Sequence, residues 1–162
     1  MEHNIIENND NLELYEFTAM QLSALFEGER DMIANLANAS AVLNEALEDI
    51  NWVGFYLMKN GELILGPFQG KVACIHIPVG KGVCGTAVAE DKTQLVYDVH
   101  EFPGHIACDS ASNSEIVIPL HCNGTIVGVL DIDSPLVGRF NEADKAGLEQ
   151  CAAVIEAACD WL

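Results

Sequence analysis

Two segments of the chain have the pattern of β-hairpins closed by an Asn-Gly turn, at Asn60-Gly61 and at Asn123-Gly124. Asn-Gly is typical of two-residue hairpin turns because both central positions of such a turn require positive φ. Apolar runs flank the turns, over residues 52–58 and 63–66 and over residues 115–122 and 125–133. Because hairpin strands pair antiparallel, this pattern predicts a largely antiparallel sheet.

Apolar residues recur at helical spacing before the first hairpin and after the second. We expect helices over three segments, which are residues 12–26, 31–47 and 141–162. Residues 1–10 are polar and rich in Asn, and we expect them to be frayed. Further elements are expected at residues 72–77 and 93–97, as strands, and at residues 83–89, as a short helix. The sequence therefore predicts one α+β domain over residues 1–162, with a largely antiparallel six-stranded sheet and the N- and C-terminal helices mainly on one face.

The charge of the chain excludes two classes of partner. The net charge is -18, and only 7 of the 162 residues are Lys or Arg. Nucleic acids and anionic membrane surfaces are both bound by clustered basic residues, so neither is expected as a partner.

The first residues lack the basic and apolar regions of a signal peptide, and no apolar run approaches the roughly 18 residues of a membrane span. We therefore expect a cytoplasmic protein.

The cysteines differ in their surroundings. Cys108 lies in a long polar segment between Asp98 and Ser114, where a reactive thiol is expected because long loops of compact domains are often functional. Cys84 stands between glycines near an expected helix N-terminus and near Lys81, which would favour its thiolate. Cys74 falls within an expected strand, where a buried inert thiol is the simplest interpretation.

The other cysteines carry no evident chemistry. Cys151 and Cys159 lie on the apolar stripe of the last helix, and Cys122 beside a turn has no evident partner. A cytosolic domain is not expected to use cysteines as a disulfide framework, and the sequence has no Cys-x-x-Cys pair. No metal site is expected, because the possible ligands lack the short spacing of zinc sites; they are Cys74, Cys84, Cys108, His76 and His105.

Three carboxylates and two aromatic residues are candidates for a binding site. Asp131 and Asp133 share one face of their strand, because side chains alternate with period two. If Glu115 converges on them, mutual repulsion keeps one carboxyl protonated near neutral pH. Alternatively, both aspartates lie in solvent at a fraying strand end. Trp52 and Tyr56 also share a strand face, either as core residues or as the wall of a pocket for an apolar group.

Seven motifs occur in an order that resembles a known family. They are Trp52-Val53-Gly54-Phe55-Tyr56, Leu65-Gly66-Pro67-Phe68-Gln69-Gly70, Gly80-Lys81-Gly82-Val83-Cys84-Gly85-Thr86, Asp98-Val99-His100, Phe102-Pro103-Gly104-His105-Ile106-Ala107-Cys108-Asp109, Ser114-Glu115-Ile116-Val117 and Gly128-Val129-Leu130-Asp131-Ile132-Asp133-Ser134. Together they closely resemble the free methionine-(R)-sulfoxide reductases built on a single GAF domain. The resemblance extends from about Leu22 to the final helix and implies a GAF-like α+β fold.

The resemblance also implies a reaction and roles for the cysteines. Cys108 would attack the sulfoxide sulfur as a thiolate and become a sulfenic acid, while a proton donor assists at the oxygen. A second thiol would then condense with the sulfenic acid to give a disulfide. In the family, the cysteines matching Cys84 and Cys74 serve this resolving role, and Cys84 is expected to be the more direct partner. Thioredoxin would restore the dithiol, and no cofactor is implied.

The remaining roles follow from the same resemblance. Glu115, Asp131 and Asp133 match the acidic substrate site, where they would bind the amino group and polarise or protonate the sulfoxide oxygen. Which acid has which role stays open. Trp52 would pack against the methyl group, and Tyr56 would line the pocket.

Two other functions stay open from the residues, together with the oligomeric state. The chain could be a non-catalytic GAF sensor of a small molecule, or a redox switch that signals through a Cys84–Cys108 disulfide. The apolar surface of the terminal helices predicts a homodimer.

Overall fold

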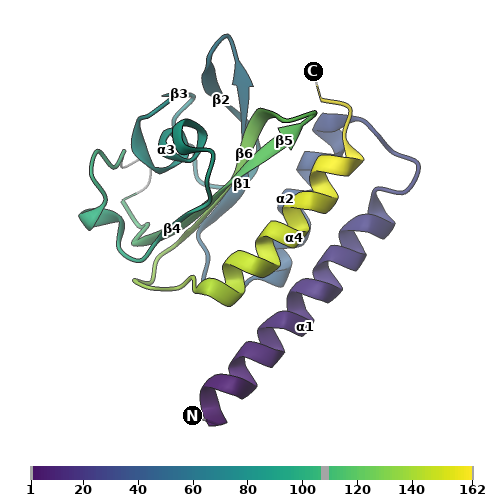
Figure 1. Ribbon diagram of the computed structural model, residues 1–162, viewed down its shortest axis with the longest axis vertical. Helices are drawn as coiled ribbons and strands as arrows, with labels where there is room; N and C mark the ends of the chain where they lie inside the picture. The colour runs from purple at the N-terminus through teal and green to yellow at the C-terminus, as the bar shows by residue number, and fades with distance from the viewer. Residues whose placement is uncertain (1, 107–109, 162) are drawn as a thin grey trace.

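Both predicted hairpins are present and lie side by side in one sheet (Figure 1). The computed structural model describes residues 2–106 and 110–161. The hairpins consist of β1 (Trp52–Lys59) with β2 (Glu62–Gly70), and of β5 (Ser114–Cys122) with β6 (Thr125–Ser134). Short edge strands complete the sheet, namely β3 (His76–Pro78) and β4 (Gln94–Val96). The six strands follow the order β3-β2-β1-β6-β5-β4, and every neighbouring pair is antiparallel, which confirms the predicted fold class.

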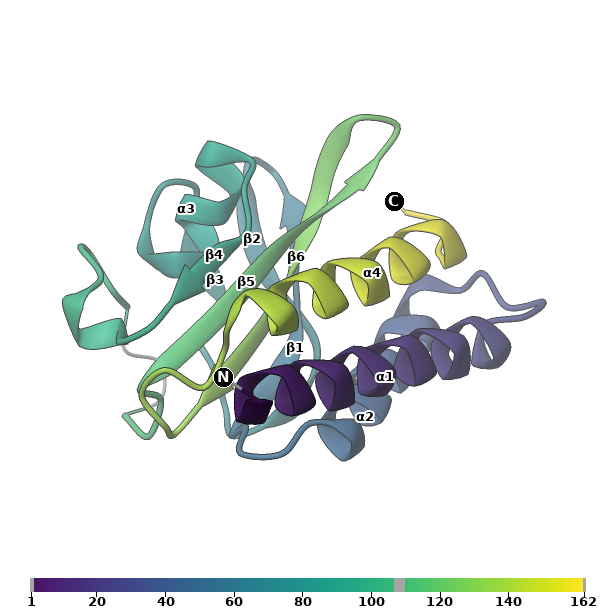
Figure 2. The same ribbon diagram turned by 60° about the horizontal axis from the view of Figure 1, so that its bottom comes forward.

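Three helices lie on one side of the sheet, two of them directly against the strands and the third packed on those two, and one helix lies on the other side (Figure 2). The three are α1 (Glu2–Leu25), α2 (Met32–Ala46) and α4 (Glu142–Ala158). The opposite face carries α3 (Gly82–Glu90) and the segments around it, including the 3-10 turn η1 (Val99–Glu101). Within the described residues, no helix combines the length and the apolar character that a membrane span requires.

The alternation of side chains along β1 divides the core into two clusters. Val53, Phe55 and Leu57 point toward α1, α2 and α4, and belong to the larger hydrophobic cluster. Trp52 and Tyr56 point to the opposite face and belong to a smaller cluster with α3. This period-two alternation explains why a strand that is buried on both faces carries aromatic residues on each side.

Polar side chains define the ends of the helices that cover the larger cluster. Asn141 and Asp144 form a reciprocal capping box at the start of α4. The hydroxyl of Tyr15 donates to Asp144 Oδ1 at 2.6 Å, which ties α1 to the same helix end. Burial and the Asp144 carboxylate raise the pKa of Tyr15, so its hydroxyl stays protonated and keeps donating.

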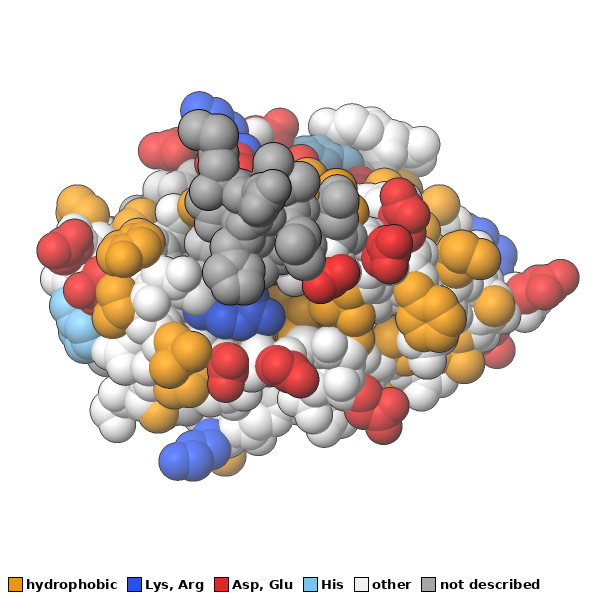
Figure 3. Space-filling model, turned by 90° about the horizontal axis from the view of Figure 1, so that it is seen from below, with side chains coloured by type: hydrophobic (Ala, Val, Ile, Leu, Met, Phe, Trp, Pro, Cys, Tyr) orange, Lys and Arg blue, Asp and Glu red, His pale blue; other side chains and the backbone are white. Residues whose placement is uncertain are grey.

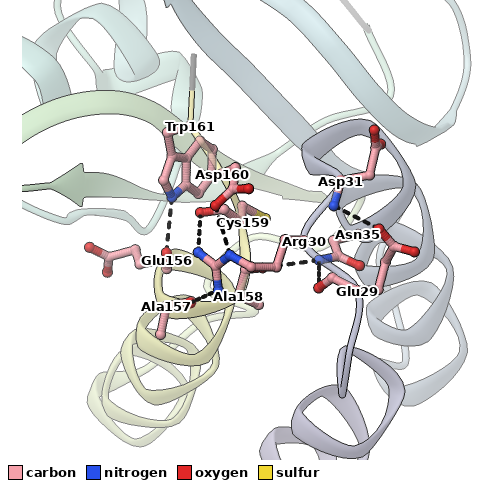
Figure 4. A network of polar contacts seen from close by, with 10 residues as sticks. All are labelled: Glu29, Arg30, Asp31, Asn35, Glu156, Ala157, Ala158, Cys159, Asp160 and Trp161. Atoms are coloured by element: carbon pink, nitrogen blue, oxygen red, sulfur yellow. Dashed lines mark hydrogen bonds and ion pairs between the residues drawn. The ribbon is translucent and has the colours of Figure 1, made fainter.

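Arg30, in the loop between α1 and α2, connects this loop to the C-terminal end of α4 (Figure 4). Its guanidinium donates to the backbone oxygens of Ala157 and Cys159 at 3.2 and 3.1 Å, and to Asp160 Oδ1 at 2.7 Å. The last carbonyl groups of a helix have no partner within the helix and attract cations. Arg30 therefore caps α4 from a distant part of the chain.

Several boundaries differ from the sequence predictions, among them the end of β2, which was expected at Gly66 and lies at Gly70. Helix α1 already begins at Glu2, within the segment expected to be frayed, because no Gly or Pro separates residues 2–11 from the helical pattern that follows. The strand expected from Val72 begins only at His76, since Trp52 and Tyr56 bond the backbone of residues 71–74 in place of a strand. Helix α4 ends at Ala158, where the Arg30 contacts hold the chain.

Candidate active site

Strand register brings the three predicted carboxylates together on the α3 face of the sheet. Asp133 pairs with Trp52 on one side and with Glu115 on the other, and Asp131 lies in the next row, opposite Gly54 and Val117. Glu115 is 7% exposed and Asp131 is 5% exposed. The alternative in which the aspartates extend into solvent at a fraying strand end is therefore wrong for Asp131, and Asp133 is half-buried.

Burial raises the pKa values of Glu115 and Asp131, and repulsion between the acids adds to the effect at Glu115. Burial raises the pKa of Glu115 well above its usual range, and the charges of Asp131 and Asp133 raise it further. Burial also raises the pKa of Asp131, to about 6, although hydrogen bonds from Glu115 and Cys84 favour its charged form. The Oδ1 atom of Asp131 has no hydrogen-bond partner among the described residues. The cluster thus combines a protonated Glu115 with a more readily ionised Asp131.

Cys84 lies in the first turn of α3 and faces this acidic cluster. Its thiol is free and buried, and it hydrogen-bonds with Asp131. Burial raises the pKa of this thiol well above its usual range, and the charges of Asp131, Glu115 and Asp133 add to the effect. The expectation that the helix N-terminus and Lys81 favour the Cys84 thiolate is therefore not met, because burial and the acids outweigh them.

The two predicted aromatic residues form a wall next to the acids. Trp52 and Tyr56 are both buried, and their rings stack with centroids 5.8 Å apart. Trp52 also stacks on Phe68, with centroids 5.1 Å apart. Burial raises the pKa of Tyr56, and the charge of Asp131 raises it further. The Tyr56 hydroxyl is therefore protonated. Both interpretations of this pair hold at once, since the rings belong to a core cluster and also line a pocket.

Polar atoms of the same rings hold the segment that carries Cys74. Trp52 Nε1 donates to the backbone oxygen of Lys71 at 3.1 Å, and the Tyr56 hydroxyl donates to the backbone oxygen of Cys74 at 3.0 Å. Leu65 N donates to Ile75 O at 2.9 Å on the other side of Cys74. The backbone around Cys74 is thus fixed to β1 and β2 without being part of a strand.

Cys74 is disulfide-bonded and half-buried, so the interpretation as an inert buried thiol is wrong. Cys84 is a free thiol, although the sequence favoured it as the more direct partner of the nucleophile. Cys108 lies outside the described residues. Cys151 and Cys159 are free and buried in the helical core as predicted, and Cys122 is free and half-buried.

The acids, the aromatic wall and the start of α3 line one pocket. Its lining includes Glu115, Asp131, Asp133, Trp52, Tyr56 and Cys84, which the sequence singled out. The sequence did not single out other lining residues, among them Ser112, Val83, Val72 and Ile106. Ser112 accepts a hydrogen bond from Asn51 Nδ2 at 3.0 Å, a contact between residues too far apart in sequence to be predicted.

The glycines of residues 80–85 shape the pocket wall that α3 provides. Gly82 has a φ of +62°, a conformation that favours glycine, and Ile106 packs directly against it. A side chain at Gly85 would collide with the backbone oxygen of Pro78. The glycine-rich pattern therefore serves the close approach of α3 to neighbouring backbone, and a phosphate-binding loop is not needed to explain it.

The described residues include one group with metal-ligand geometry. A ligand atom from each of Cys84, Glu115 and Asp131 lies within 4.8 Å of the others. These groups already hydrogen-bond with one another, so shared protons account for their proximity. A metal ion is therefore not needed to explain the cluster.

The family follows from comparison with known proteins. The model of the GAF domain matches residues 12–159. This chain belongs to the GAF domain family. The six-stranded antiparallel sheet with helices on both faces is the GAF fold that the sequence motifs implied.

Proteins with the implied activity are close relatives of this chain within the GAF family. It is 57% identical to the free methionine-R-sulfoxide reductase of Escherichia coli over 89% of this chain and 87% of that protein. It is 44% identical to the free methionine-R-sulfoxide reductase of Saccharomyces cerevisiae over 96% of this chain and 91% of that protein. The structure of the free methionine-R-sulfoxide reductase from Neisseria meningitidis in complex with its substrate matches with a TM-score of 0.88 and 46% identity, over 91% of this chain and 89% of that one.

Proposed function

We propose that this protein reduces free L-methionine-(R)-sulfoxide to methionine. The observation that carries the proposal is the cluster of buried Glu115 and Asp131 with half-buried Asp133 beside an aromatic wall, in a chain closely related to reductases of that name. This geometry offers an acid where an oxygen must be protonated and an anion where an ammonium group must be held. A hydrophobic wall for the methyl group lies next to both.

The pocket suits a free amino acid because it can hold both of its charged ends. Asp131 and Asp133 bind the ammonium group, and the buried Oδ1 atom of Asp131 is an acceptor for it. The start of α3 binds the carboxylate, because first-turn N–H groups lack partners within a helix and attract anions. Lys81 is the N-cap of α3, makes no side-chain capping bond there and lines the same pocket. A methionine within a peptide chain has neither charge, so the proposal predicts selectivity for the free amino acid.

Glu115 is the proton donor in this proposal. Its raised pKa keeps the carboxyl protonated near neutral pH, and it lies on the same sheet face as the residues that hold the ammonium group. Cys108 attacks the sulfoxide sulfur as Glu115 protonates the oxygen. Transfer of the oxygen to Cys108 releases methionine and leaves Cys108 as a sulfenic acid.

Cys74 resolves the sulfenic acid. Its thiol attacks the Cys108 sulfur, a disulfide forms, and the oxygen leaves as water. The support for this role is that Cys74 is disulfide-bonded whereas Cys84 is a free thiol held by Asp131. Cys84 completes the acidic cluster rather than forming the disulfide. Thioredoxin then reduces the disulfide, which places the enzyme in a reducing compartment such as the cytoplasm.

The protein acts as a homodimer in this proposal. Helix α1 exposes Phe17, Met20 and Leu25, which are 66%, 71% and 46% exposed. A groove beside them is lined by residues of α1, of the turn that follows it and of α4, among them Ser23, Phe26, Ala153, Val154 and Ala157. Figure 3 shows hydrophobic side chains among acidic ones on the face seen from below. Sedimentation that detects only monomers at micromolar concentration would contradict the dimer.

Substrate selectivity tests the proposed function. The purified protein is mixed with thioredoxin, thioredoxin reductase and NADPH, and then with the free R sulfoxide, the free S sulfoxide or a peptide that contains the R sulfoxide. The proposal predicts rapid NADPH consumption with the free R sulfoxide alone. Equal rates with the peptide would show that the charged ends of the amino acid are not recognised.

A further inference from the structure

The segment around Cys74 differs in charge from the rest of the chain. The protein has 25 Asp and Glu residues, yet none occurs from Leu63 to Ala89. The same segment contains Lys71 and Lys81, both exposed, although the whole chain has only 7 Lys and Arg. An acidic protein with net charge -18 thus has an acid-free stretch of chain with two exposed lysines around its disulfide-bonded cysteine, and the nearest acid that bonds this stretch is Glu62 of β2, which lies 2.8 Å from His76 Nδ1.

Exposed apolar side chains accompany these lysines. Val72 is 89% exposed, Ile75 is 59% exposed and Val79 is 41% exposed, and all three lie within five residues of Cys74. Ile106, which is 37% exposed, lines the same pocket as Val72. Single exposed apolar residues are common on protein surfaces, but apolar residues gathered around a reactive group indicate a binding surface.

We propose that Lys71, Val72, Ile75 and Val79 form the surface on which a thioredoxin-type dithiol protein docks to reduce the enzyme. We call these four residues the Cys74 surface. The inference rests on the proposed function and adds the place where the reductant binds. The partner must bring a thiolate to the half-buried Cys74, and a partner with apolar and acidic side chains around that thiolate would complement this surface.

The surface also determines which sulfur is attacked. The partner thiolate attacks Cys74 Sγ, forms a mixed disulfide with it and releases the sulfur of Cys108 as a thiolate. The second thiol of the partner then attacks its own first sulfur, which releases Cys74 as a thiol and leaves the partner oxidised by two electrons. This direction regenerates the Cys108 thiolate that the next reduction needs.

Ile75→Glu tests the apolar part of the Cys74 surface. Ile75 is not among the residues that line the pocket, so its side chain can change without altering substrate contacts. We expect kcat/KM for thioredoxin to fall by about tenfold, because a carboxylate would be placed against the partner. Turnover supported by dithiothreitol should stay within about twofold of wild type, since this small reductant needs no docking surface.

Ile33→Glu is the matched control. Ile33 is 55% exposed, in the first turn of α2 on the opposite face of the sheet, and the substitution introduces the same charge. We expect kcat/KM for thioredoxin to be unchanged in this variant. An equal loss in both variants, or no loss in Ile75→Glu, would overturn the proposal. If the wild-type protein does not reduce the free sulfoxide with dithiothreitol, the proposed function itself is contradicted. Failure of the docking surface and failure of the proposed function are therefore distinguishable.

Lys71→Glu tests the charge of the surface, with Lys59→Glu as its control. Lys59 is exposed at the end of β1, outside the segment that lacks acids. We expect Lys71→Glu to lower kcat/KM for thioredoxin and to remove most of its dependence on ionic strength, which screens such attraction. Lys59→Glu should keep the wild-type value and the wild-type salt dependence. A salt dependence that is the same in both variants would contradict the assignment of Lys71.

Trapping identifies the attacked sulfur. A thioredoxin variant without its second cysteine cannot complete the exchange, so the mixed disulfide accumulates. We expect peptide mapping of the trapped complex to find the partner joined to Cys74. A complex joined to Cys108 would overturn the proposed direction of attack.

Discussion

The hydroxyl of Tyr56 donates a hydrogen bond to the backbone oxygen of Cys74 at 3.0 Å. Tyr56 belongs to β1 and lines the substrate pocket, whereas Cys74 lies in an irregular segment and is disulfide-bonded. The contact therefore couples the pocket wall to the position of the proposed resolving cysteine. Because burial and the neighbouring acids raise the pKa of Tyr56, the hydroxyl remains a donor throughout the neutral pH range.

Tyr56→Phe should separate the two halves of the reaction. Removal of the hydroxyl frees the Cys74 backbone, and the lost hydrogen bond should lower the free energy of unfolding by about 1 kcal/mol. In single-turnover experiments with reduced enzyme, we expect the release of methionine to stay within about twofold of wild type. Disulfide formation should slow by about threefold to tenfold, because the position of Cys74 is less well defined.

Tyr97→Phe is the control for this variant, since Tyr97 is 69% exposed and is not among the residues that line the pocket. Mass spectrometry of quenched samples measures methionine, sulfenic acid and disulfide in the same reaction. If disulfide formation in Tyr56→Phe is as fast as in the control, the contact does not position Cys74.

Glu115→Gln should remove the proton donor while preserving the size of the side chain. Loss of a general acid lowers rates by about 10²- to 10⁴-fold, and we expect kcat/KM for the free sulfoxide to fall within that range. Wild-type activity should also decline at alkaline pH as Glu115 loses its proton, at a pH above the usual range of a glutamate because its pKa is raised. A pH–rate profile of both proteins measures this. An alkaline decline that persists unchanged in Glu115→Gln would contradict the role of this acid.

Asp131→Asn should become more stable relative to wild type as the pH rises. The pKa of Asp131 is raised from 3.8 to about 6, so the folded state binds the proton more tightly than the unfolded state. The resulting stabilisation is complete below about pH 4 and is lost as the pH rises through about 6. Each pKa unit corresponds to 1.36 kcal/mol, so the variant should gain about 2–3 kcal/mol relative to wild type between about pH 4 and pH 7.

Urea unfolding of both proteins at several pH values measures that gain. The comparison of two pH values cancels any constant cost of the substitution, such as an imperfect hydrogen bond to the new amide. A stability difference that does not change with pH would show that Asp131 titrates normally.

Arg30→Ala should destabilise the fold without changing catalysis. The substitution removes the hydrogen bonds to Ala157 O and Cys159 O at the end of α4, far from the pocket lining. We expect the free energy of unfolding to fall by about 1 kcal/mol, the usual scale for such caps. Arg30→Lys should recover only part of it, because an ammonium group lacks the forked donors. Thermal unfolding measures both variants, and an unchanged melting temperature in Arg30→Ala would contradict the capping role.

The sequence predicted most of the fold because its strongest local signals agree with the tertiary structure. The Asn-Gly turns at Asn60 and Asn123 both have positive φ at Asn and Gly, as the hairpin pattern requires. The face shared by Trp52 and Tyr56, and that shared by Asp131 and Asp133, also followed from period two. The strand expected at residues 72–77 was wrong over residues 72–75 because distant side chains, those of Trp52 and Tyr56, hold that backbone.

The chemistry of the site could be predicted only in part from local pattern. Glu115, Asp131 and Asp133 were recognisable, but their pKa values depend on burial by α3, which no local pattern reports. Cys84 shows the same limit, since its helix N-terminus favours a thiolate while burial and the neighbouring acids favour the thiol. The contact of Ser112 with Asn51 joins residues that only the folded chain brings together.

Reduction of free methionine-(R)-sulfoxide by Cys108→Ser tests the central claim most directly. The assay measures NADPH consumption with thioredoxin and its reductase, with Cys122→Ser as a control for the loss of a single thiol. We predict no detectable turnover for Cys108→Ser and wild-type turnover for Cys122→Ser. Turnover of Cys108→Ser at the wild-type rate would contradict the assignment of the nucleophile and the proposed mechanism with it.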